Sequence, residues 1–304
     1  GETMGSTYEV KYISNTENNY QNSIDSLLLA FNKSISTYDS TSRISKIFRG
    51  EEKEMDKIIS EVIKKAKDVY EFSEGSFDIS VGPLSNAWGW GFKNREQMDS
   101  IKVKQLLSFV GFNKVKIENN ELLLDSGMYL DFNSIAPGYA ADLIGEYLMA
   151  HGITNFMIEV GGEILCKGKN LNGKFWRIGI EKPMEGTEGK NPLEGIIELQ
   201  DEALATSGNY RRVFYENGRR YAHTLNPLTG WPVSHNLLSA TVICKTAIEA
   251  DAYATLCMVI GLEKAIEKFK DKNEVGLYLI YEDENKTLKE YLSPNLKSRF
   301  TDNN

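Results

Sequence analysis

The chain has 304 residues, of which 41% are hydrophobic and 26% charged, so it can bury a large core in one domain or in two lobes. A net charge of −8, with basic residues scattered among acidic ones, disfavours a nucleic-acid-binding or membrane-surface protein. No apolar run approaches the roughly 20 residues of a membrane helix, and three cysteines without metal-type spacing indicate neither a disulfide framework nor a zinc site.

The N-terminal part is predicted to contain one strand and two helices. Residues 1–13 have a glycine-containing turn followed by alternation typical of a strand. Apolar residues recur at three- and four-residue spacing over residues 24–35 and 55–69, which predicts two amphipathic helices. The segment between them, residues 36–45, is polar and rich in turn residues.

Residues 75–91 (GSFDISVGPLSNAWGWG) are irregular in composition. Four glycines, a proline and two tryptophans argue against a helix here. The segment is interpreted either as a loop pinned by buried tryptophans or as an aromatic-walled ligand loop, and composition does not decide between the two.

The next segments lead to a strand-to-helix junction. A helix around residues 103–110 and a hairpin (115–117 and 122–124) precede the segment LDFNSIAPGYAADLI, residues 130–144. We expect a short strand ending at Asp131, a turn, and a helix with Pro137 in its first turn. A carboxylate and free backbone amides at such a junction suit a phosphorylated ligand, although many similar junctions bind nothing.

The second half is predicted to be mainly antiparallel sheet. Strands are expected over residues 156–160, 164–167, 176–181, 195–199, 237–244 and 275–281, and helices over 246–260 and 263–269. Residues 184–192, 203–211 and 221–232 are interpreted as loops, and the chain after 281 as a polar tail. The mixture indicates an α+β fold, one compact unit of two lobes over residues 1–304.

Asp251 and Thr255 are candidate metal ligands. They are four residues apart, so they share one face of an otherwise apolar helix, where a carboxylate needs a partner. Oxygen ligands of this kind suit Mg²⁺. The alternative is that the helix dipole stabilises Asp251 while Thr255 bonds to the i−4 carbonyl.

His223 is the first choice for a proton acceptor near neutral pH. It lies between a strand and a turn, whereas His151 ends a helix and His235 follows a Pro-Val-Ser turn and is expected to be exposed. A structural role is the alternative. Thr206, Ser207 and Gly208 could bind phosphate or form an ordinary turn.

Several of these segments together resemble the FAD:protein FMN transferase family, the ApbE family. The matching segments, in chain order, are residues 1–8 (GETMGSTY), 36–45 (STYDSTSRIS), 75–91, 130–144, 158–168 (IEVGGEILCKG), 176–183 (WRIGIEKP), 203–211 (ALATSGNYR), 221–233 (YAHTLNPLTGWPV) and 246–261 (TAIEADAYATLCMVIG). The resemblance implies a two-lobed α+β fold with largely antiparallel sheets and FAD in a cleft between the lobes. It implies Mg²⁺-dependent transfer of FMN from FAD to a threonine hydroxyl of an acceptor flavoprotein, with release of AMP.

The resemblance also assigns roles to individual residues. His223 would be the base, and Asp251 would act in catalysis and bind the metal together with Thr255 and the backbone at Ser134. The flavin nucleotide would be bound by Met4, Tyr38, Ala87, Trp88, Gly89, Asp131, Pro137 and Leu225. Pro137 stands where the family usually has a charged residue, and Phe48 where it often has asparagine.

The resemblance further suggests the partners and the location. The acceptor would be a membrane redox subunit or a related flavoprotein with a flavinylation threonine motif, and no nucleic acid is expected. The sequence begins at Gly1 without a signal peptide, so we expect a processed or truncated form of a lipid-anchored protein of the bacterial periplasm or outer face of the inner membrane. The competing functions are an FAD pyrophosphatase and a non-catalytic flavin-storage protein.

Overall fold

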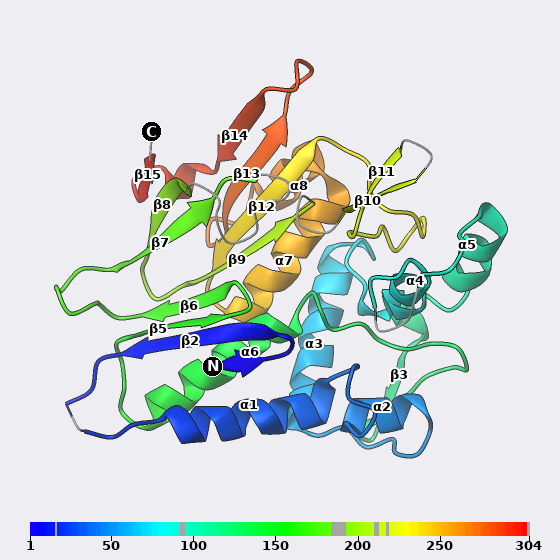
Figure 1. Cartoon of the computed structure of the whole chain (residues 1–304), viewed down its shortest axis with the longest axis horizontal. Coiled ribbons are helices and arrows are strands. Elements are labelled where there is room, and N and C mark those ends of the chain that lie inside the picture. The colour runs from blue at the N-terminus through cyan, green and yellow to red at the C-terminus, as the bar shows by residue number, and fades with distance from the viewer. Residues whose placement is uncertain (16, 92–94, 184–192, 210–212, 217–218, 303–304) are drawn as a thin grey trace.

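An eight-stranded antiparallel sheet forms the centre of the molecule (Figure 1). The computed structural model describes residues 1–15, 17–91, 95–183, 193–209, 213–216 and 219–302, with backbone only for 213–216, 219–222 and 302. The strands of this sheet, in spatial order, are β1 (Glu2–Thr3), β2 (Ser6–Tyr12), β5 (Phe156–Val160), β6 (Glu163–Lys167), β9 (Ala203–Gly208), β12 (Leu237–Cys244), β13 (Gly276–Glu282) and β14 (Leu288–Leu292).

Smaller sheets and helices surround this centre. The smaller sheets comprise β7 (Trp176–Glu181), β8 (Leu193–Leu199) and β15 (Phe300–Asp302), the pair β10 (Val213–Glu216) and β11 (Arg219–Ala222), and the pair β3 (Lys116–Glu118) and β4 (Glu121–Leu123). The α-helices are α1 (Gln21–Ile35), α2 (Arg43–Phe48), α3 (Lys57–Phe72), α4 (Gly82–Ala87), α5 (Ser100–Leu107), α6 (Ala136–Ala150), α7 (Ala247–Ile260) and α8 (Leu262–Phe269). Short 3₁₀ helices cover Ile79–Val81, Phe112–Lys114 and Pro294–Leu296. Within the described part of the chain, every strand pairing is antiparallel, which confirms the predicted α+β class.

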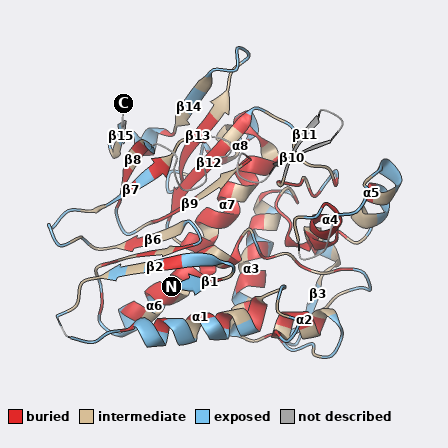
Figure 2. Ribbon diagram, viewed as in Figure 1, coloured by how far each residue is buried: buried red, intermediate tan, exposed pale blue. Residues whose placement is uncertain are grey.

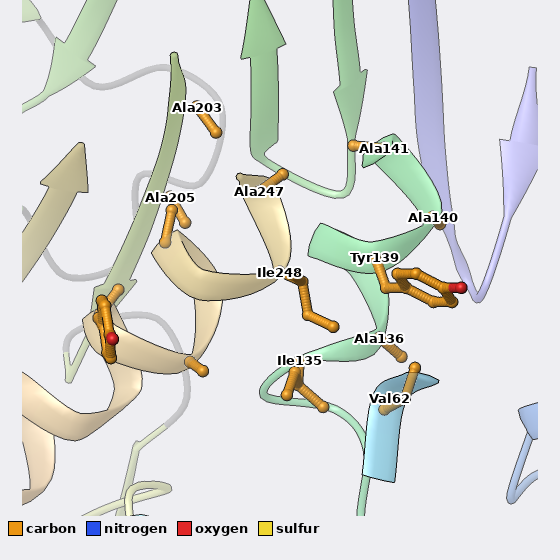
Figure 3. Packing of buried hydrophobic residues seen from close by; sticks show 14 of the residues in the cluster. Val62, Ile135, Ala136, Tyr139, Ala140, Ala141, Ala203, Ala205, Ala247 and Ile248 are labelled. Atoms are coloured by element: carbon orange, nitrogen blue, oxygen red, sulfur yellow. The ribbon is translucent and has the colours of Figure 1, made fainter. Parts of the chain in front are cut away.

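The central sheet is covered on both faces (Figure 2). Alternate residues of a strand point to opposite faces, and in β9 Ala203 and Ala205 join the core beneath the helices, whereas Leu204 joins a second core. That second core includes Ile178 and Ile197 of the β7–β8 pair, so the small sheet packs on the face opposite the helices. Figure 3 shows the small side chains that let α6 and α7 approach the sheet, among them Ala140, Ala203, Ala205 and Ala247. None of the described helices is long and apolar enough to cross a membrane.

Two segments interpreted as irregular are regular in the structure. Residues 203–208 form β9, which pairs with β12 along its whole length. The prediction of a loop was wrong because the strand consists of small and hydroxyl-bearing residues, most of which have no strong β-propensity. These residues form a strand here because they allow close packing under a helix. Residues 75–91, predicted to be too irregular for a helix, contain the 3₁₀ helix 79–81 and α4, with a proline in the first turn of α4.

Three other expectations differ from the structure. The segment before the central turn is not a strand, although the Asp131 amide donates to the Ile79 carbonyl oxygen at 2.7 Å. The tail after residue 281, predicted to be polar and irregular, instead forms β14 and β15. Strand β14 extends the central sheet, and β15 extends the sheet of β7 and β8. Tyr221 lies in β11 and not in a loop, and residues 184–192 lie outside the described residues.

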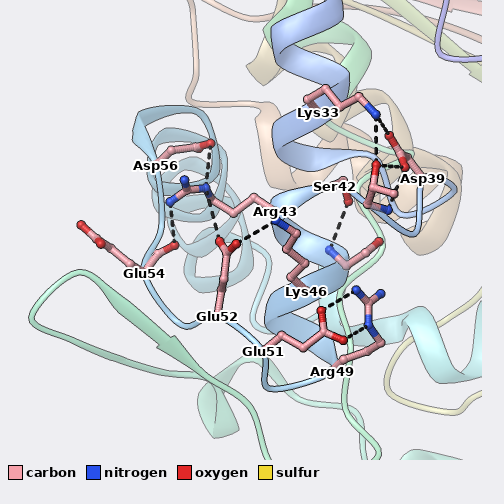
Figure 4. Close-up of polar contacts among 12 residues, drawn as sticks. Lys33, Asp39, Ser42, Arg43, Lys46, Arg49, Glu51, Glu52, Glu54 and Asp56 are labelled. Carbon is pink, nitrogen blue, oxygen red and sulfur yellow. Dashed lines mark hydrogen bonds and ion pairs between the residues drawn. The ribbon is translucent and has the colours of Figure 1, made fainter.

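The loop between α1 and α2 is fixed by polar contacts (Figure 4). Lys33 donates to the Asp39 carboxylate at 2.8 Å, and this ion pair holds the pKa of that carboxyl below its usual range. Ser42 caps α2 by accepting from the Ser45 amide, at 3.2 Å, and donates to the Ser36 carbonyl oxygen at 2.7 Å. These contacts hold the segment that carries Tyr38.

Candidate active site

The first turns of α6 and α7 are in direct contact. The Gly138 amide of α6 donates to Oδ2 of Asp251 on α7 at 3.1 Å, and Asp251 is only 4% exposed. A Cβ added at Gly138 would lie 2.3 Å from the Ala247 carbonyl oxygen. The backbone of α6 at Gly138 therefore lies directly against α7.

A second carboxylate, Asp142 of α6, lies at the start of α7. Its Oδ1 and Oδ2 accept from the amides of Ala247 and Ile248 at 2.8 and 2.9 Å. Burial raises the pKa of both Asp142 and Asp251, and the charge of Asp142 raises the pKa of Asp251 further. Two close carboxylates in a buried place favour a cation beside them.

Thr255 lies one turn beyond Asp251 and contacts the sheet. Its hydroxyl is 3.2 Å from the Ser207 hydroxyl on β9. Asp251 is the fifth residue of α7, beyond the first turn where the helix dipole acts, and Glu249 is the acidic residue of that turn. The dipole alternative therefore does not account for the burial of Asp251.

The side chains at this place suit a hard divalent cation. We call the set Ser134, Gly138, Asp142, Ser207, Asp251 and Thr255 the junction site. Ser134 is half-buried in the turn before α6, four residues ahead of Gly138. A carboxylate, a hydroxyl and backbone carbonyl groups are oxygen ligands, the donors that Mg²⁺ prefers, so these residues fit the magnesium ion that the resemblance implies.

A chain of contacts leads from the central turn to α4. Tyr38, which is 58% exposed, accepts through its hydroxyl from the Asn133 side chain at 3.3 Å. The Asn133 amide donates to Oδ1 of Asp131 at 3.0 Å, and Ser85 of α4 also hydrogen-bonds to the Asp131 side chain. Burial raises the pKa of Asp131, whereas these donors lower it. Tyr38, Asp131 and α4 are therefore linked by one chain of hydrogen bonds.

Trp88, directly after α4, anchors a separate aromatic cluster. Its ring is 2% exposed, stacks on Trp90 with centroids 5.8 Å apart, and meets Trp231 edge-on at 5.5 Å. Its indole N–H donates to the Gly230 carbonyl oxygen at 3.0 Å, and Leu225 packs in the same cluster. Ala87 ends α4 and Gly89, with φ of 81°, turns the chain away. The cluster therefore joins the 75–91 segment to the segment that follows His223.

Replacing Trp88 with phenylalanine should lower the free energy of unfolding by about 1–2 kcal/mol, because the indole hydrogen bond and some buried area are lost. Urea denaturation would measure this. Trp176→Phe is the matched control, since that half-buried indole also donates to a carbonyl oxygen, that of Lys167, at 3.0 Å. An unchanged midpoint for Trp88→Phe, or a larger loss for Trp176→Phe, would contradict an anchoring role of Trp88.

Met4 and Pro137 lie where two hairpin turns meet α6. Met4 and Gly5 form the two-residue turn between β1 and β2, both with positive φ, which is the geometry of a tight hairpin. In the β5–β6 turn, a Cβ added to Gly161 would lie 3.8 Å from the Ser6 hydroxyl and 3.9 Å from Pro137. The residues predicted to bind FAD are thus spread over the start of α6, these turns and the aromatic cluster.

His223 is connected to the junction site through β9. It directly follows β11 and is half-buried, and the hydroxyl of the next residue, Thr224, donates to the Asn209 side chain at 2.8 Å. Asn209 stands two residues after Ser207, which contacts Thr255. The end of β9 therefore brings the candidate base and the candidate metal ligands into one region.

The sequence interpretation missed Asp142 as a site residue. Its signal was present, because Asp142 is a carboxylate in an otherwise apolar helical stretch, the same criterion that singled out Asp251. Ser207 was noted only as part of a phosphate-binding or ordinary turn, and its position opposite α7 depends on the unpredicted strand β9.

Comparison with known proteins gives concordant matches. The model of the ApbE family matches residues 4–279. An FAD:protein FMN transferase of Haemophilus influenzae is 36% identical over 301 residues, covering 94% of this chain and 86% of that protein. One of Vibrio cholerae is 35% identical over 309 residues, covering 98% and 90%.

Solved structures agree. The flavin transferase ApbE from Vibrio cholerae superposes with a TM-score of 0.87 at 35% identity, covering 98% of this chain and 97% of that one. The apo form of a flavinyl transferase ApbE from Pseudomonas stutzeri gives a TM-score of 0.85 at 30% identity, covering 97% and 93%.

Proposed function

The chain belongs to the ApbE family and transfers FMN from FAD to acceptor proteins, and we propose that the junction site, with His223, is where this transfer takes place. We further propose Mg²⁺ as the metal and a threonine hydroxyl as the acceptor group. The observation that carries the proposal is the end of β9, where Ser207 contacts Thr255 and Asn209 contacts the neighbour of His223.

The proposed metal ligands are Asp251, Thr255 and the backbone at Ser134. Asp251 would hold the metal through its carboxylate, which the hydrogen bond from the Gly138 amide to Oδ2 keeps oriented. A bound Mg²⁺ would neutralise charge on the FAD pyrophosphate and orient it for attack. The residues themselves keep the carboxylate buried and fixed before substrate arrives, which avoids reorganisation during the reaction.

His223 is proposed as the general base. A threonine hydroxyl is a weak nucleophile and needs a base to accept its proton. In the proposed step the hydroxyl oxygen bonds to the phosphorus of the FMN half, the bond from that phosphorus to the bridging oxygen breaks, and AMP leaves. The proton of the hydroxyl passes to His223, so atoms and charge balance.

The flavin nucleotide is proposed to lie along the contacts that join the turns to α4. Pro137 and the turn around Asp131 would bind its phosphate side, and Met4, Tyr38, Ala87, Trp88, Gly89 and Leu225 would line its flavin side. Because the Trp88 ring is buried behind Trp90 and Trp231, its part would be to hold the backbone of Ala87 and Gly89 in place.

The deciding experiment incubates the protein with FAD, Mg²⁺ and a domain bearing a flavinylation threonine motif. We expect AMP release together with a mass gain on the acceptor equal to one FMN phosphoester, and loss of both with EDTA. Replacing the acceptor threonine with valine is the matched control, since valine has nearly the same shape and no hydroxyl.

Two other outcomes would contradict the proposal. AMP and free FMN formed equally with and without acceptor would indicate an FAD pyrophosphatase and would direct attention to Phe48, whose ring packs against Tyr129 at 5.8 Å, two residues before Asp131. FAD binding without AMP release would indicate a storage protein.

The acceptor class and the location are also proposals. The family resemblance suggests a membrane redox subunit or related flavoprotein as acceptor, and a lipid-anchored protein of the periplasm or outer face of the inner membrane. Fractionation of cells that make the full-length precursor would test the location.

A further inference from the structure

Helices α6 and α7 cap each other. The N-cap residue of α7, Thr246, forms no side-chain cap, and its hydroxyl donates instead to Glu249 at 3.0 Å. The first amides of α7, those of Ala247 and Ile248, donate to Asp142 of α6 at 2.8 and 2.9 Å. A carboxylate from a different helix thus satisfies the amide groups that a helix start leaves without an internal partner.

The start of α6 is arranged in the same way. Its N-cap residue, Ile135, forms no side-chain cap, and Pro137 has no amide hydrogen. The Gly138 amide donates to Asp251 of α7 at 3.1 Å. Each helix therefore receives its cap from the other.

The spacing within the two helices is identical. Gly138 and Asp142 are four residues apart on α6, and Ala247 and Asp251 are four residues apart on α7, so each capped amide and each capping carboxylate share a helix face. Where the two faces meet, the backbone of Gly138 lies against the Ala247 carbonyl group, with no room for a Cβ. A slide of either helix would break all three hydrogen bonds together.

We propose that Asp142 is a positioning residue for flavin transfer: with Asp251 it forms a reciprocal clasp that fixes α7 against the start of α6. The clasp sets where Asp251 and Thr255 stand relative to the turn that carries Ser134. This inference rests on the proposed function for its metal site, and on the three hydrogen bonds for its geometry.

The proposal gives Asp142 a role beyond stability. A cap alone would contribute to the free energy of unfolding, whereas a residue that places metal ligands also changes metal affinity. Groups that orient metal ligands typically affect metal affinity or activity about 10- to 100-fold when replaced.

Two variants on α6 each disrupt a different half of the clasp. Asp142→Ala removes the cap from α7 without replacing any proposed ligand residue. Gly138→Ala replaces no carboxylate and forces the helices apart, because its Cβ would lie 2.3 Å from the Ala247 carbonyl oxygen. Asp142→Asn keeps the volume and one acceptor oxygen and serves if the alanine variants do not fold.

The control is Asp99→Ala. The Asp99 carboxylate caps α5 by accepting from the Lys102 amide at 2.8 Å, so the variant loses a helix cap and one negative charge away from the junction site. Electron paramagnetic resonance would measure Mn²⁺ binding to each purified protein, and AMP release at increasing Mg²⁺ would give the half-saturating concentration. Thermal midpoints and FAD binding in EDTA complete the set.

We expect the Asp142 and Gly138 variants to weaken Mn²⁺ binding and raise the half-saturating Mg²⁺ about 10-fold or more, while FAD binding in EDTA stays within about twofold. Asp99→Ala should lose thermal stability only. Unchanged metal affinity in folded Asp142 and Gly138 variants, whatever their thermal midpoints, would overturn the clasp as a positioning device. Wild-type protein that binds Mn²⁺ through Asp251 but releases no AMP would overturn the proposed function and leave the clasp standing.

Discussion

Replacing Asp251 with alanine is expected to abolish metal-dependent AMP release and flavin transfer, with a loss beyond the roughly 100-fold upper range of outer-shell positioning residues. Asp251 is the carboxylate of the proposed ligand set, and a hydroxyl with a backbone carbonyl alone would hold Mg²⁺ weakly. Steady-state AMP release over a wide range of Mg²⁺ would measure the loss. Excess Mg²⁺ should not restore the rate.

The Asp251 variant should remain folded. The substitution leaves the Gly138 amide without its acceptor, which costs about 1–3 kcal/mol, but it also removes a buried carboxyl whose pKa is raised by that burial. The two effects oppose each other because ionising a buried carboxylate is itself costly.

Asp251→Asn is the matched variant for this test. Asparagine keeps the volume and an oxygen that can accept from Gly138, and it lacks the charge, so we expect a protein of wild-type stability without metal-dependent activity. Full turnover in Asp251→Asn or Asp251→Ala would show that the metal is bound elsewhere.

The comparison of sequence and structure shows which elements local patterns can predict: β5, β7 and β12 have the expected bounds, whereas β9 was not expected. The helix 246–260 was expected and α7 covers Ala247–Ile260, because an apolar run with an abrupt glycine end defines a helix locally. Strand β9 was missed because nothing local distinguishes ALATSG from a turn. Its strand character comes from pairing with β12 and from the closeness of α7, which are long-range contacts.

The site residues also differ in whether the sequence alone could predict them. Asp251 could be identified because a carboxylate on an apolar helix demands a partner, and the structure supplies the Gly138 amide. The proximity of Asp251 to Asp142 could not be predicted from the sequence, because two residues more than a hundred positions apart come together only through helix packing. The role of each predicted FAD-binding residue, the two lobes and the cleft between them stay predictions from the family resemblance.

For the segment 75–91, the sequence could not predict which tryptophan ring is buried. Both interpretations of its tryptophans had been open, and Trp88 is buried, whereas Trp90 is half-buried and stacks on it. Composition revealed an unusual segment but not which ring faces inward, because that depends on Trp231 and Gly230 from a distant part of the chain.

Replacing His223 with alanine is expected to reduce flavin transfer about 10²- to 10⁴-fold, the range that a positioned general base contributes. FAD binding should be retained, because His223 is not among the residues proposed to bind FAD, and its neighbour Thr224 donates to Asn209 at the end of β9. Transfer would be measured as flavin mass gained by the acceptor per unit time, and FAD binding by quenching of flavin fluorescence.

The matched control is His151→Gln. His151 follows the end of α6 and is exposed. Its Nδ1 lies 2.8 Å from the Tyr147 carbonyl oxygen and its ring meets those of Tyr147 and Tyr20, all away from the junction site, so its replacement should leave transfer unchanged. Added imidazole should restore part of the rate in His223→Ala and none in Asp251→Ala, because a small diffusible base can replace a proton acceptor and cannot replace a metal ligand.

Replacing the base and replacing the metal ligand should also affect substrate and metal binding differently. Without His223, the protein should still bind Mn²⁺ and FAD together, so substrate remains held and only proton removal fails. Without Asp251, the metal is lost and the pyrophosphate keeps its charge, so neither transfer nor hydrolysis proceeds. Near wild-type transfer in His223→Ala with metal affinity intact would assign the proton acceptor to another group and leave the proposed metal ligands of the junction site unaffected.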